Sequence, residues 1–319
     1  MNERFVAGRA GQARFTDVQC MMESVLDGWL HETIQLSPGP GVGHHRFIET
    51  NALRLDASGW STGVLVRGAG AAGAVCFGLV DGDPAAIRFR GRPLAPARIP
   101  LVQSDVEFEY TAPEPTAALV LTIDKDVFDR HAQALWRSEL TTNAAYTLPL
   151  AGMEHGMAVV KLLKNTLHNL WGEPALLQSP RVAELVTDNI LTTLLAGSPA
   201  EPARIIVPHR HHLAREAAAL LRAETDPPIS IKTLCERLRI SWRALDQGFW
   251  ELYGVSPKTY LRISRLHHVK RQLAAADPTL TNVTAVAVSW GFFQLGRFAV
   301  EYRRLFGEKP SDTLWKGAR

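Results

Sequence analysis

The fold of this chain is decided by a stretch that occurs twice, as LCERLRISWRALDQGFWELYGVSP at residues 234–257 and as VAVSWGFFQLGRFAVEYRRLFGEKP at residues 286–310. Four positions of the first copy recur 53 residues later with similar chemistry: Leu245 and Phe298, Phe249 and Tyr302, Gly254 and Gly307, Pro257 and Pro310. Upstream the separation is 52 residues, so Leu234 corresponds to Val286. Such a repeat indicates two copies of one supersecondary unit in the C-terminal third.

Each copy has the residue pattern of a helix-turn-helix. A small residue, Cys235 or Ala287, stands where two helices would cross closely. A turn is expected four residues later, at Arg239 or Gly291. Ser241 is a good N-cap for the second helix of the first copy. Both second helices are expected to end at a glycine that precedes a proline.

The second helix of each copy has one apolar face and one free face. The apolar residues at 245 and 249, and at 298 and 302, lie one turn apart and are expected to face the core. The opposite faces present Trp242, Arg243, Asp246 and Gln247 in the first copy, and Leu295, Arg297, Val300 and Glu301 in the second. These two faces are therefore free to contact a partner.

The charge of the chain is unevenly distributed. The net charge is +3, but residues 1–200 carry 16 basic and 21 acidic side chains, whereas residues 201–319 carry 19 and 11. A basic C-terminal third indicates a polyanionic partner such as nucleic acid. The alternative is a solvated basic surface without a partner.

The repeat resembles the DNA-binding domain of AraC/XylS-type transcription regulators over about residues 209–315. The first motif of that family is matched by Ser241-x-Arg243-x-Leu245-x-x-x-Phe249 followed by Gly254-Val255-Ser256-Pro257. The second is matched by Val286-Ala287-x-x-x-Gly291-Phe292 and Arg297-Phe298-x-x-x-Tyr302-Arg303-x-x-Phe306-Gly307-x-x-Pro310. The chain departs from the family at Gln247, where an arginine is common, at the equivalent Val300, and at Gly296, where a serine is usual. These departures concern the DNA sequence that is read, because the core and turn positions match.

The resemblance implies that two recognition helices, joined by a helix from about Pro257 to Ala276, enter major-groove segments about one turn (~34 Å) apart. The residues expected to read bases are Trp242, Arg243, Asp246, Gln247, Gln294, Leu295 and Arg297, the arginines reading guanine and Gln247 adenine. The residues expected to contact phosphate are Lys258, Arg262, Arg303 and Arg304. The alternative for each charged residue is a solvated surface charge, and for Trp242 it is core packing.

The N-terminal part changes its hydrophobic period near residue 124. Residues 44–124 are predicted to form short strands separated by turns, typical of an antiparallel barrel or sandwich. Helical spacing follows over 124–136, 154–171 and 181–195, and the last of these helices is an alternative dimer surface. The resemblance implies an α+β chain. It has a cupin-like β-barrel with trailing helices at 1–196, a linker at 197–207 and an all-α domain with two helix-turn-helix motifs at 208–319.

The resemblance also implies a small-molecule effector site in the N-terminal domain. The expected lining residues are His45, Trp60, Arg67, Phe77 and Phe108, for which plain core or surface roles are the alternative. His44-His45 resembles half of a cupin metal site but lacks a glutamate and a third histidine at suitable spacing. No metal or other cofactor is therefore expected.

Composition and motifs exclude several other classes. The composition, with 46% hydrophobic and 21% charged residues, is typical of a globular protein. The sequence has no run of about 18 apolar residues and no secretory signal, so a cytosolic protein without membrane contact is expected. Three scattered cysteines do not form a zinc cluster or an alkyl-acceptor site, and motifs for a nucleophilic serine, a phosphate loop or HExxH are absent, so no catalysis is expected. The expected partners, implied by the resemblance, are promoter or operator double-stranded DNA, RNA polymerase, an effector and a second copy of the chain. Activation is favoured by the same resemblance, and an architectural DNA binder without an effector is the alternative.

Overall fold

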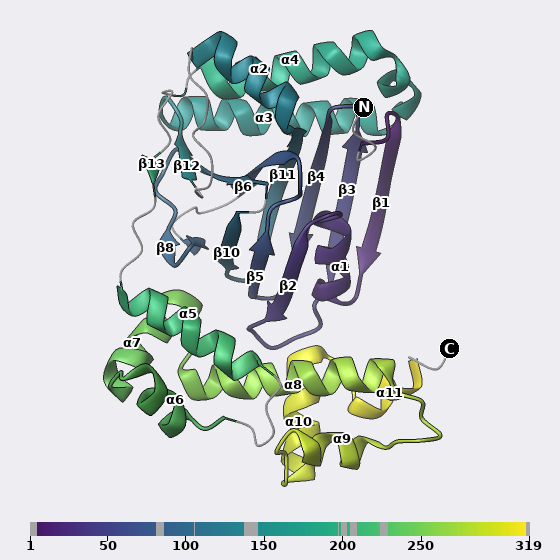
Figure 1. The fold of residues 1–319 in the computed structure, drawn as a ribbon. Helices are drawn as coiled ribbons and strands as arrows, with labels where there is room; N and C mark the ends of the chain where they lie inside the picture. Colours follow the sequence, from purple (N-terminus) through teal and green to yellow (C-terminus); the bar gives the residue numbers. More distant parts are fainter. Residues whose placement is uncertain are drawn as a thin grey trace.

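The computed structural model describes residues 5–80, 86–104, 106–136, 146–196, 198, 203–204, 209–223 and 229–316. These residues form two parts, which we call the sheet domain (described residues up to 204) and the helical domain (209–316). The sheet domain lies above the helical domain in Figure 1, and the chain is therefore of the α+β class. None of the helices in the described ranges combines the length and apolar character that a bilayer span needs.

The sheet domain contains two sheets that face each other. The larger sheet has the strand order β1-β3-β4-β11-β6-β9-β12-β13 and the smaller one β2-β5-β10-β7-β8. The strands of the larger sheet are β1 (Arg9–Phe15), β3 (Gly43–Glu49), β4 (Leu53–Trp60), β11 (Thr116–Asp124), β6 (Ala74–Val80), β9 (Arg98–Gln103), β12 (Tyr146–Pro149) and β13 (Ala203–Arg204). Those of the smaller sheet are β2 (Leu30–Gln35), β5 (Val64–Ala69), β10 (Glu107–Ala112), β7 (Arg88–Phe89) and β8 (Arg92–Pro93).

The two sheets form an open sandwich, so the expected closed β-barrel is wrong. Across the described residues, the strand ladders stay within each sheet, and an isolated bridge between Gly70 and Ser104 lies outside the named strands. A barrel closes only when ladder hydrogen bonds continue around the whole circumference. Alternating strands fit either architecture, which is why the pattern of residues 44–124 did not distinguish them.

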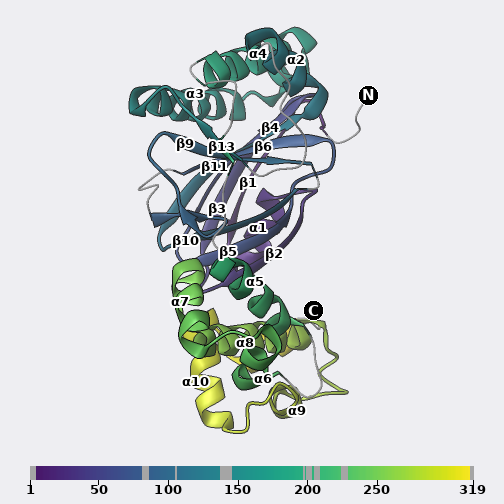
Figure 2. The same ribbon diagram turned by 60° about the vertical axis from the view of Figure 1, so that its left-hand side comes forward.

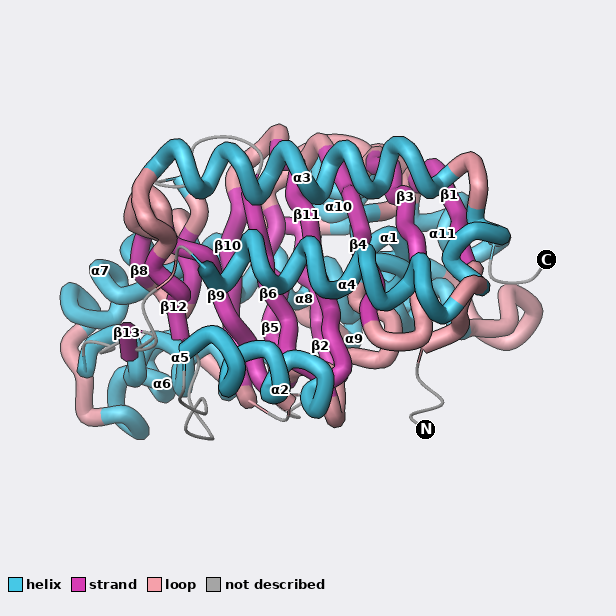
Figure 3. The backbone as a smooth tube through the Cα atoms, turned by 90° about the horizontal axis from the view of Figure 1, so that it is seen from above, coloured by secondary structure: helices cyan, strands magenta, loops and turns pink. Residues whose placement is uncertain are grey.

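Helices cover the outer face of the larger sheet (Figure 1 and Figure 3). The period change near residue 124 predicted these helices but not the face on which they pack. They are α2 (Lys125–Trp136), α3 (Met153–Trp171), the short 3-10 helix η2 (Pro174–Gln178) and α4 (Pro180–Ala196). Figure 3 looks down on α3 and α4 lying across the strands. The alternation of β4 explains this layer: Leu53 and Leu55 are fully buried in the core that these helices complete, whereas Trp60 belongs to the core between the sheets.

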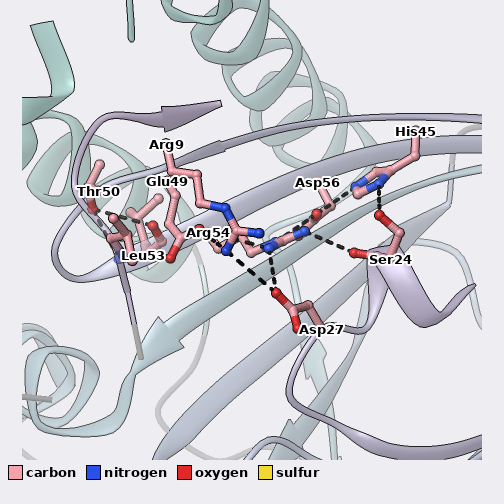
Figure 4. Close-up of polar contacts among 10 residues, drawn as sticks. Arg9, Ser24, Asp27, His45, Glu49, Thr50, Leu53, Arg54 and Asp56 are labelled. Carbon is pink, nitrogen blue, oxygen red and sulfur yellow. Dashed lines mark hydrogen bonds and ion pairs between the residues drawn. The ribbon is translucent and has the colours of Figure 1, made fainter. Parts of the chain in front are cut away.

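The first 35 residues hold structure that the sequence analysis did not anticipate, namely β1, helix α1 (Val18–Val25) and β2. A polar network ties α1 to the strands (Figure 4). His45 contacts Ser24 Oγ through Nδ1 at 3.0 Å and Asp56 Oδ1 through Nε2 at 2.7 Å, and Arg54 donates to Asp56 and to Asp27. His45 and Asp56 are almost completely buried, so this network anchors α1 within the domain.

The helical domain has the double helix-turn-helix that the repeat predicted. Its helices are α5 (His209–Arg222), α6 (Ile231–Leu238), α7 (Trp242–Tyr253), α8 (Pro257–Ala275), α9 (Val283–Ser289), α10 (Leu295–Phe306) and α11 (Pro310–Lys316). Arg239 and Gly291 occupy the turns with φ of 51° and 80°, and Gly254 and Gly307 cap α7 and α10 in the left-handed conformation. The linker expected at 197–207 lies largely outside the described residues. Within this expected linker, residues 203–204 form β13, which pairs with β12.

Candidate nucleic-acid interface

Helix α7 presents the first candidate recognition surface. Ser241 accepts a hydrogen bond from the backbone N–H of Ala244 at 3.2 Å and so fixes the first turn. Leu245 and Phe249 are fully buried, as their spacing predicted. Beside them, Trp242, Arg243 and Gln247 are exposed and Asp246 is half-buried, so the N-terminal half of α7 offers polar and aromatic groups to solvent.

Helix α10 presents the second surface in the corresponding position. Phe298 and Tyr302 are buried, whereas Leu295 and Arg297, two of the expected base readers, are exposed. Gln294 is exposed at the N-cap of the helix, and Val300 is 68% exposed. Phe293, in the turn before α10, is 78% exposed and was not among the candidates, because a single aromatic residue in a repeat pattern does not show its exposure. The second surface is thus more apolar than the first.

Helix α8 connects the two motifs and sets their relative positions. It runs from Pro257 to Ala275, in agreement with the predicted helix, and at 1.5 Å per residue it is about 28 Å long. In Figure 2, α7 and α10 lie along the same side of the helical domain. The two exposed surfaces can therefore contact one extended partner at the same time.

Carboxylates hold several of the candidate residues in place. Glu251 accepts from Gln247 at 2.9 Å and from Arg210 at 2.6 Å, and it contacts His211 Nε2 at 2.7 Å. The hydrogen bond from Arg210 is the largest cause that lowers the pKa of Glu251 to about 2, so this carboxylate is charged near neutral pH. Glu251 therefore holds the side chain of Gln247, a candidate base reader, in one rotamer in the absence of a partner.

Glu301 holds a candidate base reader on α10 in place, as Glu251 does on α7. It accepts from Arg297 Nε at 2.9 Å and is also paired with Arg262. Burial raises the pKa of Glu301, but the two arginines outweigh that effect and lower it. Arg297 must leave or share this carboxylate before it can bind a base.

The candidate phosphate contacts have different surroundings. Lys258 is exposed, with its Nζ 5.7 Å from the centre of the Trp242 ring. Arg262 is half-buried and lies 5.6 Å over Phe292 in addition to its ion pair. The side chains of Arg303 and Arg304 are exposed at the far end of α10. The four residues are therefore spread over α8 and α10.

The sheet domain holds both candidate recognition helices at their C-terminal ends. Thr111 Oγ1 donates to the carbonyl oxygen of Leu252 on α7 at 3.2 Å. Gln35 Nε2 donates to the carbonyl oxygen of Leu305 on α10 at 2.5 Å. The backbone N–H of Gly39 donates to the carbonyl oxygen of Arg304, also on α10, at 2.9 Å. Because helix C-termini have unpaired carbonyls, these bonds satisfy groups that the helices cannot satisfy themselves. The N-terminal halves with the candidate base readers remain free.

Charged and apolar contacts complete this interdomain interface. Glu109 of β10 accepts from Arg215 at 2.9 Å and from the Tyr253 hydroxyl at 3.3 Å. Asp17 is paired with Lys270, and although burial raises the pKa of Asp17, that lysine keeps it lowered. Ile34 and Leu65 of the smaller sheet belong to the same apolar core as the C-terminal helices. These residues were missed in the sequence analysis, since an interdomain pair has no local spacing.

The five expected effector residues occupy three different places. Trp60 and Phe108 line a cavity between the two sheets. Phe77 borders it, but its ring packs on Phe128 of α2 with centroids 5.7 Å apart. His45 belongs to the buried network with Ser24 and Asp56, and Arg67 pairs with Glu32 at 2.6 Å. In the described ranges, no group of three or more His, Cys, Asp and Glu residues is arranged to hold a metal ion.

Comparison with known proteins finds similarity to transcription regulators. Residues 234–315 match the family described as "Helix-turn-helix domain". Over 209 residues the chain is 29% identical to the "Probable thc operon regulatory protein" of Rhodococcus erythropolis, covering 64% of this chain and 63% of that protein. Over 133 residues it is 33% identical to the "XylDLEGF operon transcriptional activator 2" of Pseudomonas putida, covering 42% of this chain and 85% of that one.

A solved structure shows the same similarity. The chain is 38% identical to a probable AraC family transcriptional regulator from Rhodopseudomonas palustris, with 33% of this chain and 97% of that chain covered and a TM-score of 0.31. The chain spans less than two thirds of the length of the Rhodococcus regulator. The family match at residues 234–315 lies within the helical domain.

Proposed function

The chain belongs to the AraC/XylS family of transcription regulators, and on that premise we propose that it is a two-headed, sequence-specific DNA-binding regulator. In this proposal α7 and α10 enter major-groove segments about one turn apart on one face of the duplex. Residues 208–319 form the DNA-binding domain and residues 1–196 the domain that senses an effector. The family consists of regulators rather than enzymes, and the proposal includes no catalytic step.

One observation carries the proposal. The two helices that follow the turns bury matching apolar faces while their N-terminal halves stay exposed, with Arg243 and Gln247 on one helix and Arg297 on the other. Bidentate contacts of arginine to guanine and of glutamine to adenine discriminate bases by roughly 1–3 kcal/mol each. The exposed basic residues at 258, 303 and 304 would fix the register through phosphates.

The regulatory part of the proposal rests on the relatives and on the interdomain interface. Two relatives are described as an operon regulatory protein and an operon transcriptional activator, which favours activation through RNA polymerase. The sheet domain contacts both recognition helices, so a change in that domain would alter how the helices are presented. A homodimer would place two such pairs on repeated DNA sites. The second candidate is a regulator or architectural protein without an effector.

Selection of bound fragments from a genomic library by the full-length chain tests DNA recognition. We expect one enriched motif with two half-elements. Affinity for the best fragment should fall roughly 10³-fold or more between 50 and 200 mM salt, as for proteins that neutralise several phosphates. The double variant R243A/R297A should lose the enrichment, whereas W315F, on exposed Trp315 of α11, should keep it. An unenriched library with the wild-type chain would reject the proposal.

A further inference from the structure

The cavity between the two sheets has apolar walls. Its volume is about 90 Å³, and it lies among side chains of both sheets and of α1, including Met22, Trp29, Trp60, Val66 and Phe108. All of the described residues that line it are uncharged. An apolar cavity of about 150 Å³ admits benzene, which has six heavy atoms, so a cavity of about 90 Å³ fits a compound of about four heavy atoms.

Two buried polar groups in the cavity wall have no partner. Trp60 Nε1 and the Tyr110 hydroxyl both lack a hydrogen bond within the described part of the chain. Their rings meet edge to face with centroids 6.5 Å apart, so the two groups belong to one site. Burial raises the pKa of Tyr110, which therefore remains a neutral donor. A buried donor left unpaired destabilises the protein, and a ligand with an acceptor atom would recover that cost.

We propose that this cavity binds an uncharged, mainly apolar molecule with one hydrogen-bond acceptor, which receives the Trp60 Nε1–H and the Tyr110 hydroxyl. An anion would lose its hydration without meeting a cation, since none of the described side chains in the lining is charged. A hydrocarbon would leave both donors unpaired. The acceptor and the absence of charge thus define the ligand class. The role of this ligand as the effector rests on the proposed function.

Strand β10 connects this site to the interdomain interface. Side chains alternate along a strand, so Tyr110 faces the cavity while its neighbours Glu109 and Thr111 face the helical domain. Those neighbours hold Tyr253 and Leu252 at the end of α7. A ligand that moves Tyr110 therefore acts one residue away from both contacts to the first recognition helix. Occupancy of the cavity would in this way change the affinity for DNA.

The test uses the full-length chain with ¹⁵N-labelled tryptophan and three small probes. Acetone carries an acceptor, 2-methylpropene has the same shape without one, and acetate carries a charge. The indole N–H resonance of Trp60 is identified by its absence from W60F. We expect acetone to shift this resonance with at least tenfold higher affinity than either other probe. In Y110F, which keeps the ring, the preference should fall several-fold, and W315F should retain it.

The outcomes separate this site from the proposed function. A Trp60 resonance unmoved by acetone, or moved equally by 2-methylpropene, would overturn the assignment of the two donors. Tighter binding of acetate would overturn the uncharged class. DNA affinity of the same samples is measured in parallel. A ligand-dependent change supports the connection through β10, and binding of acetone with unchanged DNA affinity rejects that connection while the site stands. Loss of all DNA binding would reject the proposed function without affecting the resonance result.

Discussion

Gln35 Nε2 lies 2.5 Å from the carbonyl oxygen of Leu305, although the two residues are 270 positions apart in the chain. The side chain of Gln35 is buried and also donates to the carbonyl oxygens of Ser37 and Gly39. It therefore fastens a loop of the sheet domain to the last turn of α10. This contact between the domains helps to set the position of α10, the second candidate recognition helix.

Replacement of this side chain should weaken the interface. In Q35A the carbonyl of Leu305 loses its donor, and an unpaired buried acceptor costs about 1–3 kcal/mol of stability. Urea unfolding should show a loss of that size, and amide hydrogen exchange should increase near residues 305–307. The control Q12A changes an exposed glutamine and should stay within about 0.5 kcal/mol. Unchanged exchange in Q35A would mean that the domains do not meet in this way in solution.

The two glycine caps offer a matched pair. Gly254 and Gly307 occupy equivalent positions of the repeat with φ of +67° and +75°, so an alanine costs about 1–2 kcal/mol at either one. A Cβ at Gly254 would meet open space, whereas a Cβ at Gly307 would lie 2.9 Å from Pro40 Cβ and 3.0 Å from its Cα. We expect G307A to lose at least 1 kcal/mol more than G254A in urea unfolding. Equal losses would contradict the contact with Pro40.

The helical domain was predictable because its signals are local. The small crossing residues, the turn at Gly291 and the caps at Ser241, Gly254 and Gly307 each follow from neighbours within a few positions, and the repeat shows them twice. The boundaries of α2, α3 and α4 followed from helical spacing for the same reason. The closed barrel was wrong because closure depends on which strand edges meet, and alternation along one strand does not contain that information.

The candidate sites also contain features that local sequence signals predict and features that they do not. The exposed faces of α7 and α10 were predicted from the positions left over by the core. In contrast, Gln35, Glu109 and Asp17 act on residues more than 100 positions away, and the network of His45 with Asp56 depends on strand pairing. The roles given to the base-reading and effector residues remain predictions.

His267 should make the stability of the protein depend on pH. Burial is the largest cause that lowers its pKa to about 4, and its Nε2 accepts from the backbone N–H of Gln35 at 3.1 Å. As the pH falls from 6.5 to about 4, the unfolded chain binds this proton first, so the free energy of unfolding decreases by on the order of 3 kcal/mol. Above pH 6.5 this residue contributes no further change.

Urea unfolding at several pH values checks this dependence. In H267Q the decrease between pH 6.5 and 4 should be smaller than in the wild-type chain by on the order of 3 kcal/mol, and carboxylates such as Glu251 account for the decrease that remains. The variant H212Q, on the exposed His212, should show the same decrease as the wild-type chain. Parallel pH profiles for the wild-type chain and H267Q would show that His267 is not buried in the neutral form.

Base reading and phosphate contact should be separable by mutation. R297A should weaken binding to the selected site by roughly 1–3 kcal/mol and leave binding to random DNA almost unchanged. R304A should weaken both equally and reduce the salt slope by about 1, because a phosphate contact carries no sequence information. Fluorescence anisotropy with both DNAs at several salt concentrations measures these values. Equal losses on both DNAs for both variants would reject the assignment.

The spacing of the half-elements provides the sharpest test of DNA binding by both motifs. Since α8 connects the two helix-turn-helix motifs within one chain, we expect α7 and α10 to bind together only when their half-elements lie on the same side of the duplex, about one turn apart. The measurement is the affinity of the full-length chain for the selected site and for the same site with five base pairs inserted between the half-elements. We expect at least a tenfold loss, to the level of a single half-element. Equal affinity for the two sites would contradict it.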